Sequence, residues 1–546
     1  MTAAGREFPL AKGSPAVEST PRDPPASYSI GFLLGAIALG TASYVAKSHF
    51  SSIADSLSTR SPTLVPSFSP SNTIVDLGYA SYRGLLNDTV PDVVSWLGVP
   101  YGLPPRRFRA AQSLDETPQK HNITDLFEYP QPCVQGWAPE AGLDDRGGAG
   151  SEDCLKINIH APKSANSSSS LPVLVYIHAV IPTYIINDCH RPFDNWVQRS
   201  STPFVAVSIY YRLSVLGFLA APESPDKGVH AGDGRLALRF IQRHIRSFGG
   251  DPERVTIMGQ SAGAGSVGLH LVGSFANSPV HLPATWNFVT KYVGCSHWTW
   301  SILRTLQCLR DVDHVKLSQA ADEGMFNVIA LPPFEHWARA TYPKLSSNDI
   351  RILENLYLQS GFSPENLTDA GLSEGLFKCG TYLMGNIYGS RVYTYRFDEP
   401  GPANPERADH CADNYILFEG TRVTLQNRPS SNGTTTFTPL TPPQRALSDE
   451  LISHFITFAA SGSPNVPTSS NGPTSGFASK LNLNNAVGEP KVWPDYTSGK
   501  RLVFRAEGSG TGTNKGTEGG SYIEELNGAE IQRCKTWETL ASTIQV

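Results

Sequence analysis

The chain lacks a strong excess of charge of either sign, and this absence excludes one large class of function. Its 546 residues carry 44 Lys and Arg against 49 Asp and Glu, which gives a formal net charge of -5 at pH 7. No cluster of basic residues stands out along the sequence, so the electrostatic footprint of a DNA- or RNA-binding protein is missing. We therefore predict that nucleic acid is not a partner.

Spacings typical of metal sites are also missing. The eight cysteines contain no Cys-x-x-Cys pair, and the 14 histidines form no paired cluster. Structural zinc sites depend on such spacings, so we expect no metal site. What is present is an ordinary globular composition, with 40% hydrophobic residues, 48 Gly and 42 Pro. A chain of this length and composition can bury a large core.

Only one stretch is apolar enough to suggest a membrane. Residues 29–46 carry no charged side chain over 18 positions, which is the lower limit of length for a membrane-spanning helix. A polar leader (1–28) precedes this stretch, and a Ser/Pro-rich segment (47–72) typical of a flexible linker follows it. We predict a signal anchor at 29–46; a cleaved signal peptide and a buried core helix are the alternatives.

Other features indicate export from the cytosol. Two cysteine pairs, Cys133 with Cys154 and Cys295 with Cys308, are separated by short loops suited to disulfides, although each could also be a buried thiol. The domain is therefore predicted to be luminal or extracellular on a membrane anchor, or else secreted. Five Asn-x-Ser/Thr triplets would accept glycans there, at Asn87, Asn122, Asn166, Asn366 and Asn432.

Residues 73–507 alternate short apolar runs with amphipathic segments. The runs at 173–179 and 204–211 are continuous, rich in β-branched residues and of strand length. Such runs are typical of central strands in a mostly parallel sheet, and a further strand is predicted at 255–259. The pattern predicts an α/β fold, with a mostly parallel central sheet flanked by helices. Residues 508–546 are predicted to be a Gly/Thr-rich tail with a short helix.

A candidate nucleophile follows directly after the strand at 255–259. Gly259-Gln260-Ser261-Ala262-Gly263 places Ser261 on a tight turn from strand to helix, where side chains at the glycine positions would clash with their neighbours. The N–H of Ala262 can then face the oxyanion that develops during acyl transfer. Gly-x-Ser-x-Gly alone arises easily by chance, and a purely structural turn is the alternative. Here a strand precedes the motif and a helix-prone run follows it, as the nucleophile requires.

The residues around Ser261 resemble a known family. Phe248-Gly249-Gly250-Asp251-Pro252 followed by VTIMGQSAG is similar to the active-site signature of the type B carboxylesterase/lipase family, which includes cholinesterases and fungal lipases. SEDCLKINIHAP at 151–162 resembles the second signature of that family, and the similarity covers most of residues 73–504. The resemblance implies an α/β-hydrolase fold, hydrolysis of small-molecule or lipid esters, and disulfides Cys133–Cys154 and Cys295–Cys308.

The resemblance also nominates the rest of a catalytic triad. A nucleophilic serine needs a base to take its proton and a carboxylate to orient that base. The segment Asp322-Glu323-Gly324-Met325-Phe326 resembles the acid motif of the family and nominates Glu323, against the alternative of a solvated acidic turn. The segment Arg407-Ala408-Asp409-His410 resembles the histidine loop and nominates His410. The implied reaction passes through an acyl-enzyme and needs no metal or organic cofactor.

The sequence departs from the family at two places that matter for catalysis. Where the family has a Gly-Gly-Gly run, this chain reads Ala179-Val180-Ile181, and β-branched Val resists backbone conformations open to Gly. The oxyanion-hole donors are predicted to be the N–H groups of Ala262, Ala179 and Val180. Ser261 and Glu323 are separated by only 323 − 261 = 62 positions. Because no apolar run for the next central strand lies between them, the sheet is expected to be incomplete after the nucleophile helix.

Two hypotheses account for these departures. The first is an error in the gene model, with a retained intron near Ala179 and exon sequence lost after Val272 and after Ala320. The second is divergence into a catalytically impaired, cholinesterase-like ectodomain that serves as a binding protein. The intact set of Ser261, Glu323 and His410 favours a serine esterase or lipase, whereas the altered loop at Ala179 favours the binding protein.

Overall fold

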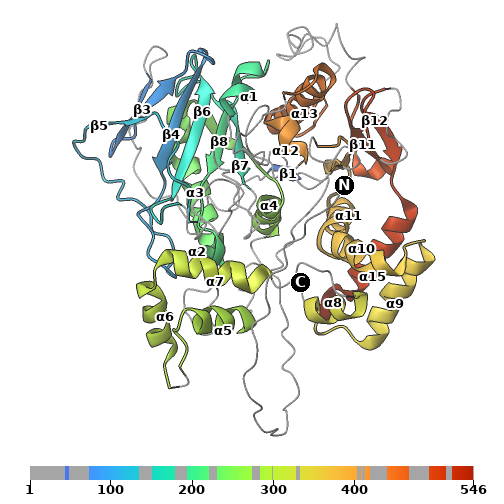
Figure 1. Cartoon of the computed structure of the whole chain (residues 1–546). Helices are drawn as coiled ribbons and strands as arrows, with labels where there is room; N and C mark the ends of the chain where they lie inside the picture. Colours follow the sequence, from blue (N-terminus) through green and yellow to red (C-terminus); the bar gives the residue numbers. More distant parts are fainter. Residues whose placement is uncertain are drawn as a thin grey trace, which may run out of the picture.

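The fold is built on one large mixed sheet with helices on both faces (Figure 1). The computed structural model describes residues 44–47, 73–134, 150–178, 193–219, 230–272, 283–297, 299–326, 333–401, 408, 412–418, 439–465, 491–511 and 519–544. Nine described strands form the sheet. Along its main path they are β1 (Tyr44–Lys47), β9 (Gly250–Gly259), β7 (Leu171–Ile177), β8 (Val205–Ile209), β6 (Lys156–Pro162), β4 (Val93–Pro100), β3 (Ser81–Leu86) and β2 (Ile74–Asp76), and β5 (Ile123–Leu126) pairs with β3.

The centre of the sheet is parallel. Strand β7 pairs in parallel with β8 on one side and with β9 on the other, so that Ile177 lies opposite both Ile209 and Gly259. The strands from β8 through β6 and β4 to β3 are antiparallel. The predicted strands at 173–179, 204–211 and 255–259 correspond to β7, β8 and β9, so their carboxyl ends meet at one edge of the sheet.

Both faces of the central strands are buried, which explains their continuous apolar sequences. Successive side chains on a strand point to opposite faces. Val173 and Val175 join the hydrophobic cluster that includes Phe240 of helix α3 (His230–His244), whereas Leu174 and Tyr176 join the cluster that includes α13 (Pro442–Ser461). The predicted α/β architecture, with helices flanking the sheet, is confirmed.

The remaining helices follow the sheet strands or form the lower and right-hand parts of Figure 1. The short helices α1 and α12 also pack on the α13 face of the sheet. The described α-helices other than α3 and α13 are α1 (Phe193–Arg199), α2 (Ser214–Phe218), α4 (Ala262–Val272), α5 (Pro283–Tyr292), α6 (Ile302–Asp311), α7 (His314–Phe326), α8 (Phe334–Thr341), α9 (Ser347–Gln359), α10 (Leu367–Ser373), α11 (Cys379–Tyr388), α12 (Ala412–Leu417) and α15 (Gly528–Ile544).

No described strand from the region after α4 joins the large sheet, as the sequence led us to expect. The later strands β10 (Tyr395–Phe397), β11 (Lys500–Phe504) and β12 (Tyr522–Glu525) form a separate three-stranded sheet. The free side of β9 is instead paired with β1 in antiparallel register. Both sheets still contribute to one hydrophobic cluster, in which Met258 of β9 and Phe397 of β10 are buried.

Strand β1 changes the interpretation of one end of the apolar run at 29–46. Residues 44–46 are the last three of that apolar run, and together with Lys47 they form strand β1. They do not belong to the predicted membrane helix, because their backbone groups pair with those of 257–259 in β9. Residues 1–28, 29–43 and 48–72 lie outside the described residues. Among the described residues, no helix combines the length and the hydropathy needed to cross a membrane.

Three disulfides join described parts of the chain. The predicted bonds Cys133–Cys154 and Cys295–Cys308 are both present. A third, Cys379–Cys534, links α11 to α15 across a sequence separation of 155 residues. The sequence predicted a tail with a short helix beyond residue 508; helix α15 instead has 17 residues and is covalently tied to the domain.

Candidate active site

Ser261 lies at the turn between β9 and α4. Strand β9 ends at Gly259, and α4 begins at Ala262. The φ angle of Ser261 is 53°, in the left-handed region that residues with side chains rarely adopt. The turn is closed by a hydrogen bond of 2.8 Å from the Gly263 N–H to the Gln260 carbonyl. This strained strand-to-helix turn is the geometry expected of a nucleophile elbow.

The two glycines of the motif are required by close backbone contacts. A Cβ atom placed on Gly263 would lie 2.0 Å from the carbonyl oxygen of Ile177 and 2.7 Å from that of His178. A Cβ atom on Gly259 would lie 2.4 Å from the backbone of Gly263. The elbow therefore packs directly against the end of β7, and only glycine fits at these positions.

A second contact holds the end of β7 from the opposite side. The hydroxyl of Tyr211, which follows β8, donates a hydrogen bond of 2.6 Å to the carbonyl of His178. The two rings also stack, with centroids 4.5 Å apart and an interplanar angle of 25°. Both side chains are buried. Sequence reasoning did not single out either residue, although the pair of tyrosines directly after a buried strand was visible.

Next to Tyr211, a buried ion pair anchors the segment that follows β8. The guanidinium of Arg212 lies 2.5 Å from the carboxylate of Asp233 in α3, and the two side chains are 5% and 0% exposed. Arg212 also donates hydrogen bonds to the carbonyls of Arg106 and Arg109. Because a buried charge is stable only when it is paired and hydrogen-bonded, this arrangement fixes the direction of the chain beyond Tyr211.

The described residues include part of the predicted catalytic set. Ser261 and Ala262 lie together at the carboxyl end of β9. Glu323 lies in the last turn of α7, and the position of its side chain is outside the described part of the structure. His410, Ala179 and Val180 also lie outside the described residues. The contacts of a Ser261–His410–Glu323 triad and of the full oxyanion hole therefore stay predictions.

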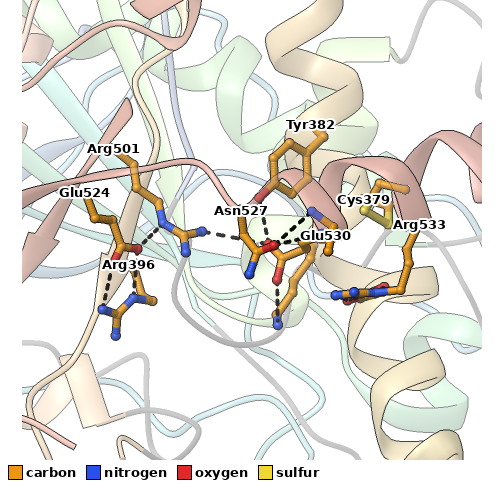
Figure 2. A network of polar contacts seen from close by, with 12 residues as sticks. Cys379, Tyr382, Arg396, Arg501, Glu524, Asn527, Glu530 and Arg533 are labelled. Atoms are coloured by element: carbon orange, nitrogen blue, oxygen red, sulfur yellow. Dashed lines mark hydrogen bonds and ion pairs between the residues drawn. A yellow bond between two sulfur atoms is a disulfide. The ribbon is translucent and has the colours of Figure 1, made fainter. Parts of the chain in front are cut away.

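One group of potential metal ligands occurs among the described residues, far along the chain from Ser261. It consists of Glu374, Cys379 and Cys534, and Figure 2 labels Cys379 in this region. The two sulfur atoms are bonded to each other, so neither is a thiolate able to bind a metal. The carboxylate of Glu374 is already paired with the guanidinium of Arg533 at 2.6 Å. This cluster is a structural connection between helices.

The candidate glycosylation sites that the structure describes are accessible. Asn87, Asn122 and Asn366 are exposed, and Asn166 is partly exposed. Asn432 lies outside the described residues. An oligosaccharide needs a surface position, and glycosylation at these four sites stays a prediction.

An elbow serine at the end of a parallel strand in an α/β sheet defines the α/β-hydrolase class. A solved structure of EstA from Aspergillus niger has this fold: the match covers 87% of the present chain and 99% of the EstA chain, with a TM-score of 0.63 and 21% sequence identity. Residues 71–282, which include the elbow, match the profile of the carboxylesterase family.

Curated relatives match part of the chain. A chlorogenic acid esterase from Aspergillus niger is 31% identical over 278 residues, which are 45% of this chain and 53% of the esterase. Secreted lipase 4 from Gibberella zeae is 33% identical over 276 residues, 43% of this chain and 48% of the lipase. The chain thus matches about half the length of these relatives. The resemblance inferred from the motifs is confirmed.

Proposed function

We propose that this chain is a carboxylic ester hydrolase with Ser261 as its nucleophile. The observation that carries the proposal is the elbow, where Ser261 is held at a φ angle of 53° between Gly259 and Gly263. A backbone angle this unfavourable persists only where the surrounding structure enforces it, and such positions cluster at functional sites. The similarity to named esterases and lipases supports the same reaction.

In the proposed reaction, His410 takes the proton of the Ser261 hydroxyl as its oxygen attacks the ester carbonyl. Glu323 orients the imidazole and stabilises its charged form. The N–H groups of Ala262, Ala179 and Val180 bind the oxyanion of the tetrahedral intermediate. His410 then protonates the leaving alcohol, and water releases the acid from the acyl-enzyme by the same steps.

The proposed substrates are esters of small molecules or of lipids, and the proposed location of the domain is outside the cytosol. Three disulfides and four accessible sequons favour an oxidising, glycosylating compartment. The relative named a secreted lipase is consistent with secretion. The alternative for location is membrane attachment through the apolar run at 29–46, which would require residues 44–46 to leave strand β1.

A catalytically impaired binding ectodomain is the second candidate function. The observation that favours it is the sequence Ala179-Val180-Ile181, which follows β7 where the family has three glycines. Removing one oxyanion donor typically lowers turnover by about 10²–10³-fold. Two misplaced donors would therefore leave little ester hydrolysis, even with an intact nucleophile.

Hydrolysis of p-nitrophenyl butyrate by the purified full chain separates the two functions. We expect measurable turnover, and we expect Ser261→Ala to lower kcat by about 10³-fold or more, because the nucleophile is lost. The variant also controls for contaminating esterases. A folded, monodisperse wild-type protein with no more activity than Ser261→Ala would contradict the proposal and favour the binding ectodomain.

A further inference from the structure

Helices α5 and α6 carry apolar side chains on two faces instead of one. Their inner faces contribute to one buried hydrophobic cluster, through Trp286, Val289, Leu306 and Leu309. Their outer faces nevertheless expose Phe288, Tyr292 and Leu303, and Leu303 is 68% exposed. A surface helix normally keeps its apolar residues on the side that packs on the core. The outer faces of α5 and α6 therefore need a separate explanation.

The exposed side chains lie at the two helix ends that the chain connects. Helix α5 ends at Tyr292 and α6 begins at Ile302, so Tyr292 and Leu303 occupy the last turn of one helix and the first turn of the next. Phe288 is one turn before Tyr292, and the centroids of the two rings are 5.9 Å apart. Both helices lie at the lower left of Figure 1, at the periphery of the molecule. We call Phe288, Tyr292 and Leu303 the α5–α6 patch.

The two helix ends are held in place before any partner binds. Cys295, three residues after α5, forms a disulfide with Cys308 of α6. Its N–H also donates a hydrogen bond of 2.7 Å to the carbonyl of Thr290 in α5. The hydroxyl of Ser301 caps α6 by accepting from the N–H of Arg304. Because ordering a surface on binding costs conformational entropy, a surface that is already ordered binds more tightly.

The same region is basic, although the whole chain is acidic. Residues 283–310 contain three Lys or Arg and no Asp or Glu, in a chain with a net charge of -5. The guanidinium of Arg304 lies over the Trp300 ring, 4.6 Å from its centroid, and Lys291 is exposed. The next acidic residue, Asp311, comes at the opposite end of α6. A negatively charged surface is therefore the electrostatic complement of this region.

We propose that the α5–α6 patch binds the surface of a lipid layer that carries negative charge. The three patch residues enter the interfacial layer, while Lys291 and Arg304 contact the headgroups. Aromatic side chains with a polar tip are enriched at membrane–water interfaces. A bilayer with acidic headgroups presents one sign of charge over a wide area, and each basic residue near it strengthens binding by about 5-fold. Such peripheral binding needs no membrane-spanning helix and does not depend on ester hydrolysis.

Cosedimentation of the full chain with vesicles of phosphatidylcholine and phosphatidylserine tests the apolar contacts. The double variant Phe288→Ser and Leu303→Ser should bind about 10–100-fold more weakly than the wild type, because two apolar side chains no longer leave water. The matched control is Ile352→Ser with Leu358→Ser, which replaces two exposed apolar side chains of α9. Its binding should change by less than about 2-fold, because it removes no contact with lipid.

The charges are tested by a second double variant, Lys291→Gln with Arg304→Gln. Its binding to the same vesicles should weaken by about 10–30-fold, whereas binding to vesicles of phosphatidylcholine alone should stay nearly constant. High salt should weaken wild-type binding to the anionic vesicles for the same reason. Equal affinity of this variant and the wild type for anionic vesicles would overturn the proposal.

A fluorescent label identifies which part of the chain meets the lipid. An environment-sensitive fluorophore on Leu303→Cys should shift to shorter wavelength when anionic vesicles are added, whereas the same label on Ile352→Cys should not. The labelled wild-type protein gives the background from other cysteines. Ser261→Ala should bind as the wild type does, so a failure of the proposed hydrolysis leaves this result readable.

Three outcomes would overturn the proposal. One is vesicle binding that is absent, or that is unchanged by Phe288→Ser with Leu303→Ser. Another is a label at position 303 that stays in water while the protein is bound. The third is a dimer in sedimentation velocity that the same double variant dissociates, which would assign the α5–α6 patch to a second copy of the chain.

Discussion

At the scale of single residues, the elbow shows how a strained backbone angle constrains its neighbours. A residue with a side chain in the left-handed region costs of order 1–3 kcal/mol, and Ser261 has a φ angle of 53°. The surrounding backbone contacts must offset that cost. At Gly263 the backbone lies so close to the carbonyls of Ile177 and His178 that no Cβ atom would fit. Stability and the geometry of the elbow are therefore coupled at this glycine.

Gly263→Ala should destabilise the protein strongly. Its Cβ atom would lie 2.0 Å from the Ile177 carbonyl oxygen, so the elbow or the end of β7 must move. We expect the free energy of unfolding to fall by about 2–4 kcal/mol in a urea titration.

Gly268→Ala is the matched control on the same helix, α4. A Cβ atom there has no neighbour within 4 Å, and Ala is a better helix former than Gly. This variant should be neutral or stabilising by up to about 1 kcal/mol. Similar losses of stability in both variants would show that helix α4, and not the contact with β7, is the sensitive feature.

At the scale of elements, α15 is tied to the domain by a disulfide and by buried polar contacts. The disulfide Cys379–Cys534 joins it to α11, and Arg533 pairs with the buried Glu374; Figure 2 labels Cys379 and Arg533. Glu530 accepts a hydrogen bond from Tyr382. Burial alone would raise the pKa of Glu530, but Lys378, Tyr382 and Arg501 together lower it, so the carboxylate remains charged in its network.

Removing the long-range disulfide should cost more stability than removing a short-range one. In the chain-entropy account, a cross-link stabilises the folded state by restricting the unfolded chain, and its effect grows with loop length. For Cys379–Cys534, with a separation of 155, the double Cys→Ser variant should lose about 5 kcal/mol of unfolding free energy.

The matched control is the double Cys→Ser variant at Cys295 and Cys308. Its loop is much shorter, with a separation of 13, and the expected loss is about 3 kcal/mol. Both double variants replace two sulfur atoms by oxygen. The difference between their losses of unfolding free energy therefore measures the effect of loop length. A larger loss for the short loop would contradict the entropic explanation and point to native packing around Cys295.

At the scale of the whole molecule, buried ionisable groups make folding sensitive to pH. His160 lies in β6 and is 1% exposed, and its Nδ1 atom is 2.8 Å from the Ser95 hydroxyl. Burial lowers the pKa of His160 to about 4, although the carboxylate of Asp194 acts in the opposite direction. An unfolded histidine has a pKa of about 6.5. The folded protein therefore holds His160 neutral in a range where the unfolded chain is protonated.

Stability should consequently fall on acidification through this range. Between pH 6.5 and 4 the unfolded state binds a proton that the folded state does not, so the free energy of unfolding decreases as pH falls. His160→Gln should flatten the profile by up to about 3 kcal/mol over that window, measured by urea unfolding at each pH. Burial also lowers the pKa of His270 to about 4, so part of the slope should remain. If unfolding free energy depends on pH in the same way in the variant and the wild type, His160 does not contribute to the acid sensitivity of folding.

Local patterns in the sequence determined the fold class and the strand-to-helix elbow that carries Ser261. The continuous apolar runs at 173–179 and 204–211 predicted central strands because both faces of β7 and β8 are covered by helices. The elbow was predictable because its glycines and Ser261 lie close together in the chain. The missing apolar run agrees with the finding that no described strand directly after α4 joins the large sheet. The disulfides at 133–154 and 295–308 were found because short loops and family motifs mark them.

The tertiary structure alone decided the contacts between distant segments. The pairing of β1 with β9, the disulfide Cys379–Cys534 and the placement of α15 join residues that no local periodicity connects. The hydrogen bond from Tyr211 to His178 exists only because β7 and β8 are parallel neighbours. A sequence specifies each strand through its own pattern of burial, but which side chains meet at the strand ends depends on how the sheet is assembled.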